Sequence, residues 1–120
     1  MIRWKKMGLL VLTGLSCVPA IDYEKAQQYP LYIRETKVED VVFKSGDIWK
    51  RATFVVTNST RHNCQLICVE YGAGGRIIEK TCTKIGNYPP SKSLTITALA
   101  PKINPPYSAW CYTNVVPLYR

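Results

Sequence analysis

The stretch CQLICVEY (residues 64–71), followed by GAGG (72–75) and RIIEKTCTKI (76–85), is the part of the sequence that decides the fold. The first and last runs are rich in β-branched and aromatic residues, which favour strands. The glycine-rich centre can adopt the positive φ values that a tight turn requires. The stretch therefore predicts a β-hairpin.

Four cysteines of the chain lie in or after this hairpin, and we expect two disulfides. If Tyr71 faces Arg76 across a four-residue loop, Cys64 lies one position away from facing Cys82, and a bulge would bring the two thiols together. Of the three connectivities that four cysteines allow, we favour Cys64–Cys82 with Cys68–Cys111. Zinc is the less favoured alternative, because only Cys64 and Cys68 have a ligand spacing and the chain holds 1 histidine.

Further strand-like runs flank the hairpin. They are residues 29–34, 37–44, 48–57, 93–99 and 109–116, and turn residues separate them at 45–47, 58–60 and 87–91. Pro30 suits the start or the edge of a sheet, so 29–34 is expected to be an edge strand that a partner could extend. No segment has a helical hydrophobic period. The pattern predicts an all-β, antiparallel β-sandwich, with a small open barrel as the alternative.

Residues 1–20 have the pattern of an export signal. Arg3, Lys5 and Lys6 precede the apolar run 7–16, which is far shorter than the roughly 20 residues of a membrane-spanning helix. Two processing routes remain open. A signal peptidase could cut after Ala20, or Cys17 could be acylated in the lipobox-like sequence TGLSC, which shortens the leader to 1–16. We favour the lipoprotein, with a linker at 21–28 and one domain at 29–120.

Cysteine number and charge fit an exported protein. Without Cys17, the chain keeps an even set of four cysteines, as expected in an oxidising compartment. The whole chain carries a net charge of +8, and most of the excess lies after residue 48. Such a field attracts acidic partners, but no run of consecutive basic residues resembles a nucleic-acid-binding tail.

The sequence offers little for catalysis. His62 is the only histidine and stands beside a cysteine expected to be oxidised, while Glu70 and Glu79 are explained as surface partners of nearby cations. We therefore predict no enzyme activity, no cofactor, no small-molecule substrate and no nucleic-acid partner. Tyrosine and arginine dominate interface energetics, so residues of these types, with lysines, in loops and terminal segments are the candidates for protein binding: Arg61, Arg76, Tyr88, Lys92, Lys102, Tyr107, Tyr112 and Tyr119.

Residues 52–98 resemble bacterial FxLYD-type immunoglobulin-like domains. The shared features are VTNST (56–60), a hairpin with Tyr71, Ala73, Gly75, Ile77 and Ile78, and a proline turn before an alternating strand. The resemblance implies an immunoglobulin-like fold in an extracytoplasmic setting.

Two functions are expected from these observations. The favoured one is a lipoprotein of the bacterial cell envelope, anchored to the outer membrane, that binds protein partners as an accessory or scaffold of a secretion, conjugation or pilus assembly. The alternative is a periplasmic or secreted inhibitor that blocks an enzyme or a receptor.

Overall fold

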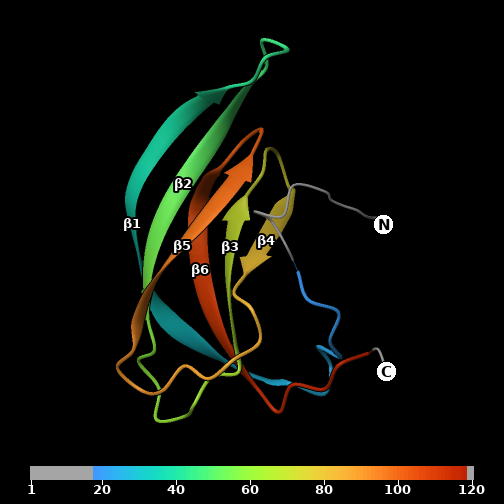
Figure 1. The fold of residues 1–120 in the computed structure, drawn as a ribbon, viewed down its shortest axis with the longest axis vertical. Coiled ribbons are helices and arrows are strands. Elements are labelled where there is room, and N and C mark those ends of the chain that lie inside the picture. The colour runs from blue at the N-terminus through green and yellow to red at the C-terminus, as the bar shows by residue number, and fades with distance from the viewer. Residues whose placement is uncertain (1–17, 119–120) are drawn as a thin grey trace.

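The computed structural model describes residues 18–118, which form six antiparallel strands and no helix (Figure 1). Residues 1–17, which include Cys17 and most of the expected leader, and residues 119–120, which include Tyr119, lie outside the described residues. The strands are β1 (Gln27–Val42), β2 (Ile48–Thr57), β3 (Leu66–Gly72), β4 (Ile78–Cys82), β5 (Ser93–Ala100) and β6 (Asn104–Thr113). The predicted all-β, antiparallel architecture is confirmed.

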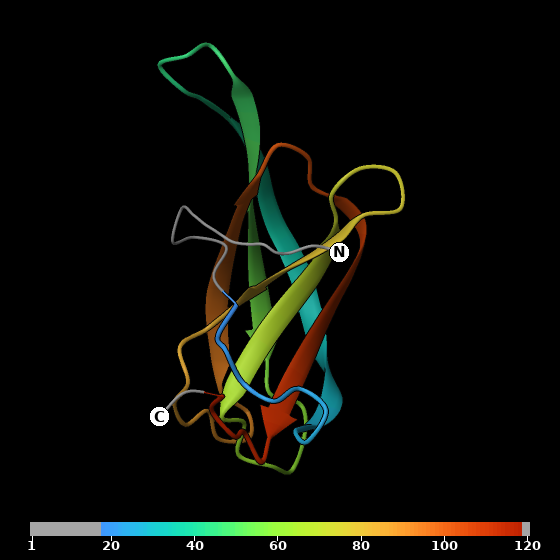
Figure 2. The same cartoon turned by 90° about the vertical axis from the view of Figure 1, so that its right-hand side faces the viewer.

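All six strands belong to one curled sheet with the order β4-β3-β6-β1-β2-β5. The expected strands 29–34 and 37–44 are a single long strand, β1, which changes neighbours along its length. Its residues Gln27 to Leu31 pair with β6, and Tyr32 to Val42 pair with β2. The sheet curls at this change of partner, so β3, β4 and β6 lie in front of β2 and β5 in Figure 2.

The core lies inside the curl and is built by alternating residues. On β2, Ala52, Phe54 and Val56 are fully buried, while the residues between them are more exposed. β3 is buried on both faces. Ile67 and Val69 face the central core, whereas Leu66 belongs to a second apolar cluster on the outside of the sheet.

The second cluster is covered by the segment that precedes β1. Ile21 is 2% exposed and packs with Leu66 and Tyr112. Tyr23 meets the Tyr112 ring edge-on at 5.4 Å, and Lys80 Nζ lies 4.3 Å from the centre of the Tyr23 ring. Burial, with a smaller contribution from Tyr112, raises the pKa of Tyr23. The segment expected to be a linker is therefore packed on the domain.

All four predicted cysteines form disulfides, but the favoured connectivity is wrong. The bonds are Cys64–Cys111 and Cys68–Cys82. The error lies in the hairpin register, because Ala73 N donates to Ile77 O at 2.8 Å and the loop therefore spans 73–77. Tyr71 consequently faces Glu79 and not Arg76, which places Cys68 directly opposite Cys82.

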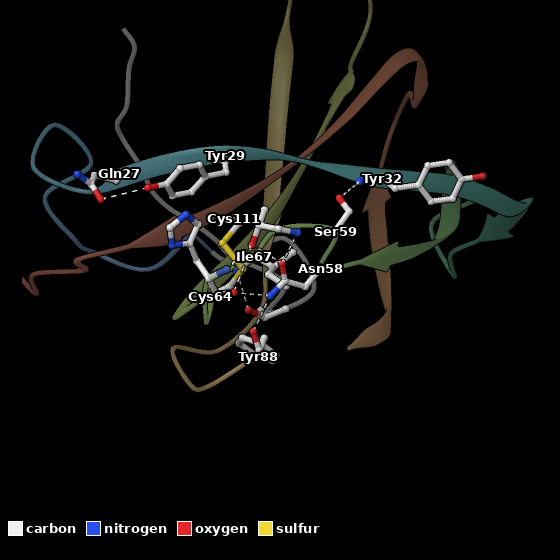
Figure 3. Close-up of a disulfide and its surroundings, with 12 residues drawn as sticks. Gln27, Tyr29, Tyr32, Asn58, Ser59, Cys64, Ile67, Tyr88 and Cys111 are labelled. Carbon is white, nitrogen blue, oxygen red and sulfur yellow. Dashed lines mark hydrogen bonds between the residues drawn. A yellow bond between two sulfur atoms is a disulfide. The ribbon is translucent and has the colours of Figure 1, made fainter. Parts of the chain in front are cut away.

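Asn58 connects three segments at the end of the sheet that carries Cys64–Cys111 (Figure 3). Its side chain is 1% exposed, and its amide nitrogen donates to the carbonyls of His62 and Tyr88, each at 2.8 Å. Its amide oxygen accepts from Thr60 N at 3.0 Å and from Thr60 Oγ1 at 2.6 Å. Because every polar atom of the amide is used, the hydrogen-bonding capacity of the buried Asn58 side chain is satisfied.

The two disulfides are expected to differ in their contribution to stability. Cys64–Cys111 spans 47 residues of sequence and Cys68–Cys82 spans 14. From loop-closure entropy, we expect the free energy of unfolding to fall by about 4 kcal/mol in Cys64→Ala/Cys111→Ala and by about 3 kcal/mol in Cys68→Ala/Cys82→Ala. Denaturant unfolding of both variants tests the order. Peptide mapping that recovers a Cys64–Cys82 link would contradict the connectivity itself.

Replacing Asn58 by Ala is expected to lower the free energy of unfolding by about 2–4 kcal/mol, because the partners of its amide are left unsatisfied. Ser59→Ala is the matched control. Ser59 is exposed and its Oγ accepts one long bond of 3.3 Å from Tyr32 N, so a loss below about 1 kcal/mol is expected. Equal losses in the two variants would show that Asn58 is not the connecting residue.

Candidate protein-binding surface

The hairpin formed by β1 and β2 projects beyond the rest of the sheet (Figure 1). The last residue of β2 that pairs with β5 toward this end is Lys50, which faces Ala100. The two strands continue through the pairs Val41–Trp49 and Val42–Ile48, where β5 no longer flanks them. We call residues 38–51 the hairpin arm.

The tip of the arm is the turn that was predicted at residues 45–47. Phe43 N donates to Asp47 O, and Gly46 N donates to Phe43 O, both at 2.9 Å. Gly46 has a φ of +93°, a conformation that a side chain would strain. Ser45 Oγ donates to Asp47 Oδ2 at 2.9 Å, which orders the turn further.

The outer face of the arm is held together by its own side chains. Phe43 meets the Trp49 ring edge-on at 5.2 Å. Glu39 accepts from Arg51 Nε at 2.8 Å and lies 3.3 Å from Lys37 Nζ. These hydrogen bonds hold the pKa of the Glu39 carboxyl below its usual value. The ion pairs are exposed and add little stability individually, but they fix the side chains in one arrangement.

The inner face of the arm presents apolar side chains to solvent on either side of the exposed ion pair between Asp40 and Lys50. Val42 and Ile48 face each other and are 68% and 58% exposed, and Val38 is 40% exposed. Val38 pairs with the fully buried Ala52, so by strand alternation these side chains continue the face that forms the core. Exposed apolar side chains such as the facing pair Val42 and Ile48, beside an ion pair, are typical of surfaces that contact other proteins.

A β-bulge sets which residues reach this face. The register between β1 and β2 shifts between Glu35 and Lys37. A bulge adds one residue to its strand, so Val38 lies on the same face as Ile33 despite the odd spacing between them. Without the extra residue, the charged Lys37 would point inward and Val38 outward.

Tyr107 marks the base of the arm. Its ring packs against Phe54 at 4.9 Å, and its hydroxyl is hydrogen-bonded to Glu35. Desolvation, followed by the Glu35 contact, raises the pKa of Tyr107 to about 12. The contact joins β6 to Glu35 of β1, which lies beyond Leu31, where the pairing of the two strands ends.

The residues predicted to bind partners do not form one surface. Arg61, Tyr88 and Lys92 lie in the loops around Asn58, and Tyr88 is partly engaged because its hydroxyl donates to Lys84 O at 2.7 Å. Arg76 and Lys102 lie in the exposed loops after β3 and β5. These two loops are close together, because a Cβ added at Gly74 would lie 3.2 Å from Lys102 Cδ.

Tyr112 is not part of a free surface, and its prediction as a binding residue is wrong. The side chain is 3% exposed in the cluster beneath Ile21. Burial, with a smaller effect of Glu70, raises its pKa. Tyr119 stays a prediction, because it lies outside the described residues.

Sequence reasoning missed the apolar inner face of the arm. Val38, Val42 and Ile48 lie in runs predicted as strands, but alternation alone does not distinguish a covered face from an open one. The available signal was the turn at 45–47, which makes 37–57 one long hairpin.

The described residues contain no helix long and apolar enough to cross a membrane. Within 18–118, no three His, Cys, Asp or Glu side chains gather as ligands for a metal ion. No family model, curated protein or solved structure matches the chain.

The Tyr107–Glu35 contact predicts a pH dependence in alkali. Since the folded pKa of about 12 exceeds the ordinary 10.0, the stabilisation is fully present below pH 10 and is lost as the pH rises through about 12. Glu35→Gln should lower the pKa of Tyr107, though not to 10.0, because its burial remains. Ultraviolet titration measures this, with Tyr107→Phe identifying the transition. An unchanged pKa in Glu35→Gln would contradict the contact.

Proposed function

We propose that this chain is a non-enzymatic, protein-binding module of the bacterial cell envelope, which acts as an accessory or scaffold of an envelope assembly and binds its partner through the hairpin arm. The observation that carries the proposal is the set of exposed apolar side chains Val38, Val42 and Ile48 on the inner face of an ordered arm, where they flank the Asp40–Lys50 ion pair. A preorganised apolar surface loses little entropy on binding, which suits protein recognition.

Export is supported by the cysteines. Cys64–Cys111 and Cys68–Cys82 are both disulfides, which persist in oxidising compartments such as the periplasm. Acylation of Cys17 would then hold the domain at the outer membrane. Since the chain is already packed on the domain from Ile21 onward, only a short segment would separate the lipid from the folded part.

The environment of the residues considered for catalysis supports a binding role. Cys64 is disulfide-bonded and so offers no thiolate to His62. The His62 ring stacks on Tyr29 at a distance of 4.4 Å. Glu70 accepts hydrogen bonds from Trp110 Nε1 at 3.1 Å and from Ser108 Oγ at 3.3 Å. These contacts explain the residues without a reaction.

We also propose that the curled sheet is a variant of the immunoglobulin-like sandwich, in line with the FxLYD-type resemblance. The pairings of β2 with β5 and of β3 with β6 correspond to the B–E and C–F pairs of that fold. In this correspondence β1 is strand A, β4 lies beside strand C, and the position of strand G is taken by the first residues of β1.

A secreted or periplasmic inhibitor is the second candidate. The projecting arm favours it, because a narrow two-stranded arm with an apolar end can enter the cleft of an enzyme or a receptor. Arg76 and Lys102, exposed in the loops after β3 and β5, would favour an acidic partner in either case.

The proposal is tested by placing a photocrosslinking amino acid at Val42 in the cells that produce the protein. A specific adduct with an envelope protein is expected at Val42 and not at Ile85, a control side chain that is also exposed (47%) but lies outside the arm. Val42→Ser/Ile48→Ser should abolish capture at a third arm position, Val38, without lowering the melting temperature, since both side chains are mostly exposed. Equal adducts at Val42 and Ile85 would overturn the role of the arm.

Intact mass separates the two candidates. A mature chain that begins at an acylated Cys17 and sediments with membranes supports the anchored scaffold. A mature chain that begins at Ile21 and remains soluble overturns the anchor and favours the inhibitor.

A further inference from the structure

The described chain is bonded to the domain almost from its first residue. Pro19 O accepts hydrogen bonds from Tyr23 Oη at 3.0 Å and from Ile21 N at 3.1 Å. Val18 is the single residue between Pro19 and Cys17. Two residues of fully extended chain reach at most about 7 Å. An acyl group on Cys17 would therefore leave no flexible linker between a membrane and the folded domain.

The first and last described segments form a short two-stranded ribbon. Leu118 N donates to Ala20 O at 3.1 Å, and Asp22 N donates to Val116 O at 2.9 Å. Ile21, between these two hydrogen bonds, is buried in the second apolar cluster. Side chains alternate along such a ribbon, so Val116 and Leu118 lie on the face opposite to Ile21 and point away from the cluster.

The outward face of the ribbon is apolar. Val116 and Leu118 are exposed on it, and the exposed Val18 precedes it in the chain. We call these three side chains the terminal patch. Asp22 shares this face, but its carboxylate serves the turn that follows, where Oδ1 accepts from Glu24 N at 3.1 Å. Neighbouring exposed apolar side chains are typical of protein or membrane contacts.

The position of Cys17 decides between these two kinds of partner. A bilayer that holds an acyl group of Cys17 comes within about 7 Å of Pro19. A helix or a further sheet layer placed between the ribbon and the bilayer would need about 10 Å. The space is too narrow for a protein, and the lipid itself is the partner that fits.

We propose that the terminal patch rests on the bilayer that holds the acyl chains of Cys17, with Val18, Val116 and Leu118 at the boundary between headgroups and acyl chains. This placement rests on the acylation proposed above and goes beyond it in one respect. A domain on a long flexible linker has no fixed orientation, whereas this domain, which has no linker, is held in one.

The orientation determines where the hairpin arm points. Both views place the arm and the red end of the chain toward opposite ends of the molecule (Figures 1 and 2). With the terminal patch on the bilayer, the arm is directed away from the membrane. Its exposed side chains Val42 and Ile48 are then presented to a partner in the surrounding compartment.

Quenching of tryptophan fluorescence by brominated lipids tests the contact. The acylated chain is extracted from the cells that produce it and reconstituted into phosphatidylcholine vesicles with or without bromine on the acyl chains. After subtraction of the wild-type signal, Leu118→Trp should be quenched at least about twofold more strongly than Val42→Trp, because a side chain at the headgroup boundary reaches the acyl chains. Val42 is the control, since it is exposed on the arm.

A charge in the patch gives the second measurement. In the Leu118→Trp chain, Val116→Asp should lower the quenching to the value found at position 42, although the acylated chain still floats with the vesicles. Ile77→Asp is the matched control: it places the same charge on an exposed aliphatic residue in the loop after β3 and should leave the quenching unchanged. Circular dichroism confirms that each variant is folded.

The outcomes separate this placement from the anchor on which it rests. Equal quenching at positions 118 and 42 of the acylated chain, or equal effects of Val116→Asp and Ile77→Asp, would overturn the contact and leave the anchor intact. An intact mass without acyl groups on Cys17 would overturn both.

Discussion

The change of partner within β1 is the constraint on which the rest of the structure depends. Its first residues, to Leu31, bond to β6, and the remainder, from Tyr32, bonds to β2, so one strand joins the two halves of the curled sheet. Because both halves are held by the same strand, their inner faces must close on each other around Phe54 and Ile67. The same change leaves the upper half of β1 without a neighbour on one side, and this frees the arm to project.

The two ends of the molecule are stabilised in different ways. At the end near Asn58, one disulfide and the saturated amide of Asn58 connect the loops, and Tyr88 pairs through both backbone groups with Cys64. In the described part of the chain, the arm at the opposite end is held by the hydrogen bonds of the Gly46 turn, the Phe43–Trp49 contact and exposed ion pairs. Regions with few buried contacts open at lower cost than the core, so the amides of the arm are expected to exchange with solvent before those of the cross-linked end.

The sequence predicts elements well where local chemistry decides them. The hairpin around 72–75, the turn at 45–47 and the alternating run at 93–99 were all predictable, since glycine and strand propensity act over a few residues. The disulfide pairing was not. It depends on whether the loop holds four residues or five, which the Ala73–Ile77 hydrogen bond decides. Tyr112 and Tyr107 likewise lie on one strand, and only the first of them is buried, in the cluster that contains Ile21 and Leu66.

The arm also shows why its surface is hard to find from sequence. Val38, Val42 and Ile48 lie on the same face as Ala52, Phe54 and Val56, although Asp40 and Lys50 interrupt the apolar alternation between them. They differ in what covers them, because Ala52, Phe54 and Val56 pack in the core with residues of β3 and β6, and Val38, Val42 and Ile48 lie outside that core. Apolar side chains that extend past their covering layer are unfavourable in solvent. On the outer face, the Phe43–Trp49 contact and the ion-paired Glu39 keep the arm ordered. A strand pair that is ordered without a third strand, and that exposes Val42 and Ile48 on its inner face, is the feature on which the proposed binding role rests.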